Sequence, residues 1–381
     1  MNGNTTEKVQ GKNVAPYAGQ ILVTRTFLPK IEDYSGLLEK IWESGHVTNN
    51  GPLCIQLEEL LKIRLDVPHL LPVSNGTLAL QLAIKALNLT GEIITTPYSY
   101  VATTNAILWE GCDPVFVDIC PQTFCIDPSL IERAITKKTT AILATHVYGY
   151  PCAVEEIEKI ATKHGLKVIY DAAHAFGVKL RGRSLLSYGD CSTLSFHATK
   201  LFHTGEGGAV ISFNPDLAER LYLMSKFGHS GEDFYFDIGI NAKLSEFHAA
   251  MGLAVLPQLE KIIEARRECS LWYDALLSDM LVERPHLSPE LEYNYSYYPV
   301  VFPSQEIMMR VRTALQGQGI FPRRYFYPSL NTLPFLHPNQ KKPCPISESV
   351  SMRVLSLPLY VGLEKAQVEL VCHIICSQCN G

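Results

Sequence analysis

Apolar and polar positions along the chain follow two different periods. Short runs that are apolar almost throughout, such as "PVFVDI" and "KVIYD", are typical of strands buried on both faces. Between them lie longer segments with apolar residues at helical spacing, such as "AVEEIEKIATKHG", which stops at a glycine. From about residue 69 to residue 240 such strands and helices follow one another in turn. This alternation predicts a mostly parallel sheet with helices on both faces.

The pattern changes past about residue 240. Residues 241–277 show one long helical pattern with a break expected near Pro257, and a strand-like segment, "YNYSYYPVVF", comes after it. A helix, a loop rich in proline and tyrosine, and a final helix complete the chain. We therefore expect a large α/β domain over residues 20–245 and a smaller C-terminal α/β domain over 246–381. Residues 1–19 are polar and lack the apolar segment of a secretion signal, so we expect a disordered leader there.

The composition of the chain mainly excludes certain partners and locations. The chain has 381 residues, of which 47% are hydrophobic and 19% charged, and this is the profile of an ordinary globular protein. A formal net charge of −5 gives no electrostatic reason to expect nucleic acid or an acidic membrane as a partner. We find no uncharged apolar run long enough to span a membrane. The eleven cysteines are scattered and odd in number, a pattern that predicts reduced thiols in a cytoplasmic protein.

Three of the cysteines lie close together near the C-terminal end, in the stretch "CHIICSQC" from Cys372 to Cys379. A metal site is one interpretation of this spacing. There is no second pair of ligands at a matching distance, however, and an amphipathic helix that carries cysteines explains the same residues. We expect no metal.

Two polar segments follow predicted strands, and ligands of a parallel α/β sheet bind beyond the carboxyl ends of its strands. The turn "SNGT" at residues 74–77 precedes a helix expected to start at Leu78, so its amides, its hydroxyl groups and the helix dipole suit a phosphate. A plain capping turn would use the same residues. Asp171 ends the strand "KVIYD", and its carboxylate needs a charged partner if it is buried. Capping of a helix is the alternative for Asp171.

A third segment, "SFHATKLFHTGEGGAV", holds a single lysine, Lys200. Most lysines are solvated at the surface, and that is the simpler interpretation. The alternative is a nucleophile that forms an imine, which desolvation and nearby positive charge favour because both make the amine neutral part of the time. Ser195 lies five residues before the lysine, and the glycines behind it let the chain turn sharply.

The order of these segments matches the needs of pyridoxal 5′-phosphate. This cofactor takes a lysine for its aldehyde, an acid for its pyridine nitrogen, a phosphate pocket and a flat surface against its ring. Tyr100 is the candidate for the flat surface, because it follows a predicted strand and stands beside small residues. Packing in the core would also explain Tyr100.

Taken together, the motifs resemble the sugar-nucleotide aminotransferases of fold type I, the DegT/DnrJ/EryC1/StrS family, from about residue 20 almost to the end. They are, in order, "VTNNGPLCIQLEELL", "VSNGTLAL", "TTPYSYVATTNAI", "VIYDAAHAFG", "SFHATKLFHTGEGGAV", "GINAKLSEFHAAMGL" and "LSLPLY". Each motif alone is weak, but the ordered set is specific. The resemblance implies an aspartate-aminotransferase-like α/β fold, with a large, mostly parallel sheet of seven strands and a smaller C-terminal α/β domain.

The resemblance also implies roles for single residues. Lys200 would bond covalently to the cofactor aldehyde and later carry a proton to and from the substrate carbon. Asp171 would keep the pyridine nitrogen protonated, and His174, which stands where many relatives have glutamine, would lie near the phenolic oxygen of the cofactor. The residues expected to bind the phosphate are Gly76, Thr77 and Ser195.

A further residue implied by the resemblance is Asn241, in "GIN", which would reach the phosphate from the neighbouring subunit. The active site would then be shared within a homodimer, and a monomer would be inactive. Thr48, Asn49 and Tyr327 are expected to line the sugar-nucleotide pocket. Packing between the domains is the alternative for the tyrosine-rich loop that holds Tyr327.

The implied reaction is a transamination in two stages. L-Glutamate would leave its amino group on the cofactor, and a keto-sugar linked to dTDP would then receive it. The preferred substrate is dTDP-4-keto-6-deoxy-D-glucose, which would give dTDP-4-amino-4,6-dideoxy-D-glucose, a precursor of surface polysaccharides such as the O-antigen of lipopolysaccharide. Amination at C-3 and a UDP-linked substrate are the alternatives.

Two further alternatives concern the kind of protein. Some relatives have histidine in place of the lysine and remove a hydroxyl group, but Lys200 is present here. A catalytically silent binding or regulatory homologue is the other alternative. The intact lysine, aspartate and phosphate turn argue against it, as does the lack of a basic patch.

Overall fold

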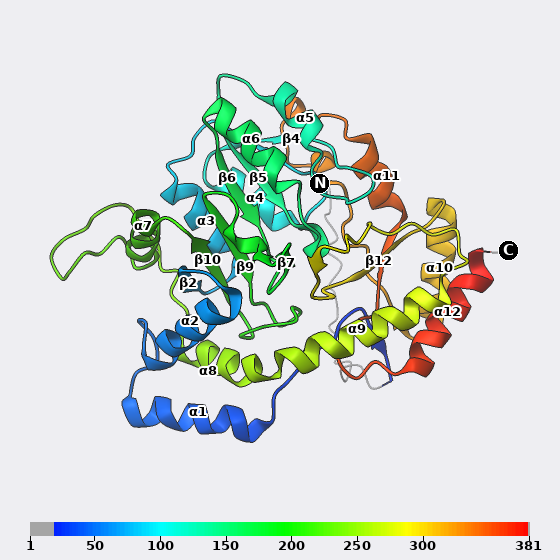
Figure 1. Cartoon of the computed structure of the whole chain (residues 1–381), viewed down its shortest axis with the longest axis horizontal. Coiled ribbons are helices and arrows are strands. Elements are labelled where there is room, and N and C mark those ends of the chain that lie inside the picture. The colour runs from blue at the N-terminus through cyan, green and yellow to red at the C-terminus, as the bar shows by residue number, and fades with distance from the viewer. Residues whose placement is uncertain (1–18, 380–381) are drawn as a thin grey trace, which may run out of the picture.

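A seven-stranded sheet forms the centre of the computed structural model, which describes residues 19–379 (Figure 1). Apart from Gly19, the leader expected over residues 1–19 lies outside the described residues. The strand order is β2-β10-β9-β6-β5-β3-β4, and all neighbours are parallel except β10, which is antiparallel to both β2 and β9. The predicted large, mostly parallel sheet is thus confirmed. Its strands are β2 (His69–Val73), β3 (Glu92–Thr95), β4 (Asp113–Phe116), β5 (Thr139–Thr145), β6 (Lys167–Asp171), β9 (Cys191–Ser195) and β10 (Gly208–Ser212).

Both faces of this sheet are buried, which explains why its strands are apolar almost throughout. Side chains of successive strand residues point to opposite faces, and the neighbours Val168 and Ile169 accordingly belong to two different hydrophobic clusters. One cluster includes residues of α3 (Gly76–Ala86), α4 (Val101–Trp109) and α7 (Pro215–Ser225). The other includes residues of α2 (Pro52–Leu65), α6 (Val154–His164) and α8 (Glu246–Val255).

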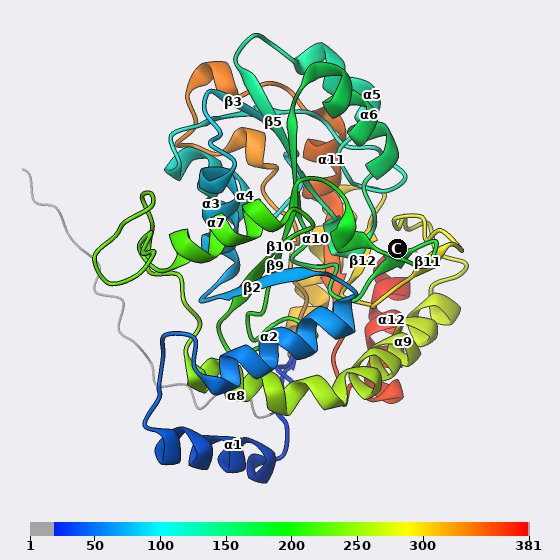
Figure 2. The ribbon, with the colours of Figure 1, turned by 60° about the vertical axis from the view of Figure 1, so that its left-hand side comes forward.

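The long helical pattern after residue 240 forms two helices. Helix α8 ends at Val255, a short 3-10 turn contains Pro257, and α9 (Leu259–Leu276) continues the path. The break expected near Pro257 is therefore confirmed. The first helix begins later than the pattern indicates, at Glu246, because the hydroxyl of Ser245 caps it by accepting from the His248 amide. Figure 2 shows α8 beside α2 and α1 (Ile31–Ser44).

A second packing centre lies towards the C-terminus. Strands β12 (Tyr298–Val301) and β14 (Val354–Leu357) pair antiparallel, and helices α9, α10 (Gln305–Gly317) and α12 (Lys365–Cys379) pack around them. The division expected at residues 245 and 246 stays a prediction, and contacts cross it in several places. Helix α8 packs on α1 and α2, and β1 (Ile21–Leu22) pairs with β13 (Ile320–Phe321). The remaining elements are α5 (Pro128–Ile131), α11 (Pro345–Arg353) and a small sheet of β7 (Lys179–Leu180), β8 (Arg183–Ser184) and β11 (Leu291–Glu292).

Three elements differ locally from the expectation. Helix α3 begins at Gly76 instead of Leu78, because the side chain of Asn75 caps it by accepting from the Leu78 amide at 2.9 Å. The stretch "DPSLIERAIT" at residues 127–136 is expected to be one of the helices of the alternating pattern, but it forms a single α-helical turn followed by a 3-10 turn. The strand expected over residues 293–302 is reduced to β12, because Asn294 and Ser296 bind main-chain oxygens near His174 instead of extending the sheet.

The predicted cysteine-bearing C-terminal helix is present as α12. All eleven cysteines are free thiols. Between residues 19 and 379, no group of three or more His, Cys, Asp or Glu side chains is arranged to hold a metal ion. Every helix in this part of the chain is also too short or too polar to cross a lipid bilayer.

Candidate active site

The candidate site lies at the carboxyl ends of β6 and β9, where helix α3 begins. Two glycines bring these elements into close contact. A Cβ atom on Gly76 would lie 3.0 Å from the Cβ of Ser195, and one on Gly208 would lie 2.8 Å from the backbone nitrogen of Gly76. Because Asn75 caps only the Leu78 amide, the first amides of α3 stay available beside the hydroxyls of Thr77 and Ser195. Such a helix N-terminus suits an anion.

Asp171, the last residue of β6, is only 5% exposed. Its Oδ2 accepts a hydrogen bond of 2.7 Å from the Thr103 hydroxyl, and its Oδ1 accepts one of 3.1 Å from the Ala173 amide. Burial raises the pKa of Asp171 above its usual value, while the two hydrogen bonds and the charge of Lys200 act in the opposite direction. A cationic group in front of this carboxylate would offset the cost of burying it.

Lys200 lies in the loop between β9 and β10, half-buried. Its Nζ donates to the hydroxyl of Tyr297 at 3.2 Å and lies 5.6 Å from the centre of the same ring. The loop itself is fixed, because the Ala198 amide donates to the Gly205 oxygen at 2.7 Å and His203 bonds the Phe27 oxygen at 2.6 Å. Lys200 is therefore not a freely solvated surface lysine.

His174 follows β6 and is 4% exposed. The Tyr148 amide donates to its Nδ1 at 3.2 Å, so the proton of the neutral ring resides on Nε2. The ring stacks on Phe326, with centres 5.6 Å apart, and meets the edge of Tyr297 at 4.9 Å. Burial, helped by the charge of Lys200, lowers the pKa of His174 well below its usual value. The side chain is thus a neutral donor through Nε2.

One small cavity joins several of these residues. His174, Ser195 and Lys200 line it together with Tyr297. Sequence reasoning missed Tyr297 and Thr103. The only signal for Tyr297 was its place in the aromatic run before β12, and for Thr103 it was the spacing of one helical turn from Tyr100.

Other predicted residues lie at the edge of this region. Tyr100 is 59% exposed at the residue before α4, so it is not part of the core. Thr77 is exposed in the first turn of α3. Asn241 is exposed too, and the residue after it accepts a hydrogen bond of 2.8 Å from the Ser74 amide of the same chain. The segment of Asn241 therefore borders the phosphate turn, and its reach into a neighbouring subunit stays a prediction.

The structure does not bring the three predicted substrate residues to the Lys200 cavity. Thr48 and Asn49 are exposed in a loop that is held by a 3.1 Å bond from the Glu246 amide to the Val47 oxygen. Tyr327 is 46% exposed, with the Arg324 guanidinium 3.3 Å from its ring centre. Its place in the sugar-nucleotide pocket stays a prediction, and the adjacent Phe326 is the residue of this loop that stacks on His174.

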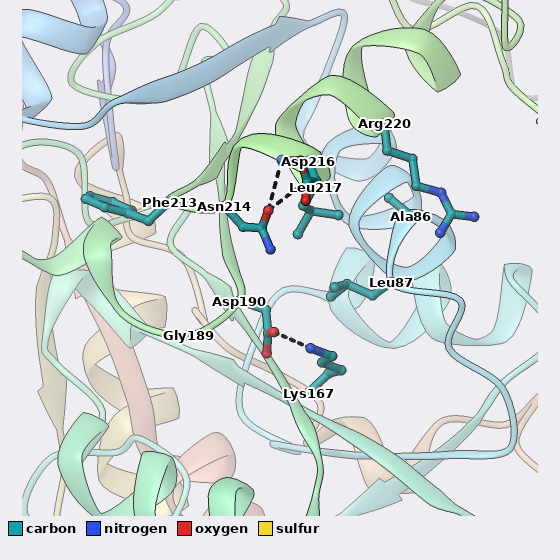
Figure 3. Close-up of a pocket in the computed structure, with 10 residues that line it drawn as sticks. All are labelled: Ala86, Leu87, Lys167, Gly189, Asp190, Phe213, Asn214, Asp216, Leu217 and Arg220. Atoms are coloured by element: carbon teal, nitrogen blue, oxygen red, sulfur yellow. Dashed lines mark hydrogen bonds and ion pairs between the residues drawn. The ribbon is translucent and has the colours of Figure 1, made fainter. Parts of the chain in front are cut away.

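A wider pocket, of about 530 Å³, lies at the opposite end of the sheet, where β6 and β9 begin (Figure 3). Two ion pairs within the chain involve charged groups of this pocket. Lys167 contacts Asp190 at 2.7 Å, and Arg220 contacts Asp237 at 2.6 Å. The Asn214 side chain is used to cap α7. These pairings give no reason to place the chemistry here.

Known proteins resemble this chain along nearly its whole described length. The family model described as the DegT/DnrJ/EryC1/StrS aminotransferase family matches residues 30–376. The chain is 40% identical to the dTDP-4-amino-4,6-dideoxy-D-glucose transaminases of Shigella dysenteriae and Escherichia coli, in each case over 93% of this chain and 98% of the relative. It also superimposes on the crystal structure of DesI determined in the presence of its TDP-sugar product, with a TM-score of 0.90 and 33% identity over 97% of this chain and 95% of DesI.

Proposed function

Because the chain belongs to the DegT/DnrJ/EryC1/StrS aminotransferase family, we propose that it transfers the amino group of L-glutamate to dTDP-4-keto-6-deoxy-D-glucose. The products are dTDP-4-amino-4,6-dideoxy-D-glucose and 2-oxoglutarate. The observation that carries the proposal is the meeting of Lys200, buried Asp171 and the N-terminus of α3 at one end of the sheet. The 40% identical relatives named as transaminases for this sugar support the choice of substrate.

The residues present suit pyridoxal 5′-phosphate. The close approach of Gly76 and Gly208 leaves free amides that fit a phosphate, and the buried carboxylate of Asp171 fits a protonated pyridine nitrogen. When bound, this cofactor supplies an electron sink for the charge that develops at the substrate carbon. The phosphate would be held by Gly76, Thr77 and Ser195, and Tyr100 would cover the ring.

Lys200 has two tasks in this proposal. Its amine would hold the cofactor through the aldehyde. The same amine would move a proton, away from the α-carbon of glutamate in the first half of the reaction and onto C-4 of the sugar in the second. Tyr297 accepts a hydrogen bond from Nζ and so fixes the direction of the amine. His174 would offer its Nε2–H to the phenolic oxygen of the cofactor, and because the ring is neutral it would add no positive charge there.

The proposal includes a homodimer with a shared site, to which Asn241 of each chain contributes. The segment between α7 and α8 projects away from the sheet (Figure 1). It spans residues 226–245, includes Asn241 and exposes a cluster of large apolar side chains, which is unusual for a surface that meets only water. A second copy of the chain would cover them. They are Phe227, Phe234, Tyr235, Phe236, Ile238 and Ile240.

We also place this enzyme in the cytoplasm. Thiols stay reduced in that compartment, and the eleven free cysteines support the assignment.

The test is a set of incubations with L-glutamate and keto-deoxysugar nucleotides that differ in keto position and base. NMR of the product locates the new nitrogen. We expect nitrogen at C-4 of the dTDP sugar, with one 2-oxoglutarate formed for each amino sugar. Nitrogen at C-3, or a preference for the UDP sugar, would overturn the proposed substrate within the same class. No turnover with any of them would favour the silent homologue.

A further inference from the structure

A row of buried hydroxyl groups leads to the carboxylate of Asp171. Thr145, the last residue of β5, donates to the Ser99 hydroxyl at 3.1 Å. The hydroxyls of Ser99 and Thr103 are 2.8 Å apart, and Thr103 in the first turn of α4 donates to Asp171 Oδ2 at 2.7 Å. Ser99, Thr103 and Thr145 are all buried. Three separate elements, β5, the turn before α4 and α4 itself, are thus linked by hydrogen bonds to one carboxylate oxygen, which Thr103 alone of the three hydroxyls contacts.

The negative charge of Asp171 fixes the donor-to-acceptor direction of every hydrogen bond in this row. An ionised carboxylate only accepts, so the proton of Thr103 must point to Asp171. Thr103 then has to accept from Ser99, and Ser99 from Thr145, so all three hydroxyls donate in the same sense. Such chains strengthen each member by polarisation, more so where water is excluded. If Asp171 were protonated, the three hydroxyls would no longer have to donate in the same sense.

We propose that Thr103 is a positioning residue, which holds Asp171 ionised and keeps one carboxylate oxygen turned towards the bound cofactor. This inference rests on the function proposed above, because the task of Asp171 is to face the cofactor's ring nitrogen. With Oδ2 bound by Thr103 and Oδ1 by the Ala173 amide, the carboxylate cannot rotate without breaking a bond. Its direction is therefore set before any ligand arrives.

The other groups around Asp171 do not replace Thr103. Lys200, in the loop after β9, acts on Asp171 through its charge and makes its own hydrogen bond to Tyr297. Cys152, after β5, donates its thiol to the Thr145 oxygen. His146 approaches only with its backbone amide, which donates to the Asp171 carbonyl at 3.0 Å. The hydroxyl of Thr103 is thus the side-chain donor on the carboxylate.

The test compares three variants of the full-length protein loaded with pyridoxal 5′-phosphate. Thr103→Val keeps the shape of the side chain but removes the donor, and Thr103→Ser keeps the donor. The matched control is Thr104→Val, one residue along α4, since the Thr104 hydroxyl is buried with no partner within residues 19–379. The readouts are the pH titration of the visible absorbance of the Lys200-bound cofactor, and kcat and KM measured separately.

We expect Thr103→Val to move the midpoint of the absorbance titration by about one pH unit, and to lower kcat about tenfold with KM within about threefold, as for a lost hydrogen bond to a charged group. Thr103→Ser and Thr104→Val should both match the wild type. An unchanged titration in a folded Thr103→Val protein would overturn this inference alone. A wild type in which borohydride traps no adduct on Lys200 would overturn the proposed function, and this inference with it.

Discussion

The two ends of the central sheet carry similar residues in opposite circumstances. At the amino end, Lys167 and Asp190 form an ion pair of 2.7 Å beside a wide pocket, and both remain partly exposed to water. At the carboxyl end, Asp171 is buried and held by two neutral donors, and Lys200 binds a tyrosine hydroxyl. The wide pocket thus contains ion pairs, whereas Asp171 and Lys200 at the carboxyl end have neutral hydrogen-bond partners.

This difference teaches where function is to be sought in such a fold. A buried carboxylate costs free energy unless something compensates it, and groups that carry this cost are concentrated at sites where a ligand binds. The size of a hollow carries less information than the pairing of the groups around it. Variants at the two ends should therefore behave in opposite ways, and the contrast can be tested in order of expected effect.

The largest effect is expected for Lys200→Ala. Without the amine there is no covalent bond to the cofactor and no group to carry the proton, so kcat should fall by about 10⁴, the upper range for a proton-transfer group. Steady-state kinetics and mass analysis after borohydride treatment measure the two losses. Added methylamine should restore part of the activity. An adduct found on another side chain would contradict the assignment.

The next effect is expected for Asp171→Asn. Loss of the negative charge should lower kcat by about 100-fold or more, the scale of one electrostatic contact to the reacting group. Stability without cofactor should change in the opposite sense. Because burial raises the pKa of Asp171, its ionised form weakens folding as the pH rises through the folded-state pKa, and the asparagine variant escapes this loss.

Urea unfolding of the wild type and of Asp171→Asn, both without cofactor and at pH 5 and pH 8, measures this difference in stability. The gain of the variant over the wild type should be larger at pH 8. A variant that is less stable than the wild type at both pH values by the same amount would show that Asp171 is a structural residue.

Much of this arrangement could be predicted from the sequence, because the informative residues are local to strand ends. Asp171 and Ser195 end their strands and the turn at 74–77 follows another, and parallel strands bring their carboxyl ends together. The mostly parallel sheet is predicted from the alternation of apolar strands and amphipathic helices along the chain. The family resemblance added the roles of Lys200 and His174, which stay predictions.

What the sequence could not supply are contacts between distant segments. Tyr297 meets Lys200 across 97 positions, and Thr103 meets Asp171 across 68. Neither residue differs from its neighbours in hydrophobicity or spacing, so only the packing of the helices and loops selects it. The aromatic loop gives a second example. Tyr327 is predicted to line the sugar-nucleotide pocket, which stays a prediction, but nothing in the sequence indicates that the neighbouring Phe326 stacks on His174.

A third prediction concerns His146, which follows β5 at the carboxyl end and is fully buried. Burial lowers the pKa of His146 to about 3, whereas an unfolded histidine has a pKa near 6.5. The unfolded chain therefore takes up a proton that the folded chain refuses between these values, so stability falls as the pH drops. From pH 7 to pH 5 this one group should cost about 2 kcal/mol.

His146→Asn removes the titration but keeps an acceptor for the Cys152 amide, which donates to His146 Nδ1 at 3.1 Å. Loss of the stacking on Tyr170 lowers stability at every pH. The readout is therefore the difference between urea unfolding free energies at pH 7 and pH 5, which should shrink by about 2 kcal/mol in the variant. An unchanged difference would mean that His146 accepts a proton in the folded protein.

The smallest effect is expected at the amino end, for Lys167→Met. The ion pair with Asp190 is partly exposed, and such pairs contribute at most about 1 kcal/mol. Asp190 also keeps a second donor, the Val168 amide at 2.8 Å, so its carboxylate is not left unpaired. Unfolding free energy should therefore fall by less than about 1 kcal/mol, and the difference should shrink further at high salt. Activity measurements complete the comparison of the two ends. We expect kcat and KM to match the wild type. A tenfold fall in kcat or a tenfold rise in KM would mean that the pocket in Figure 3 takes part in function.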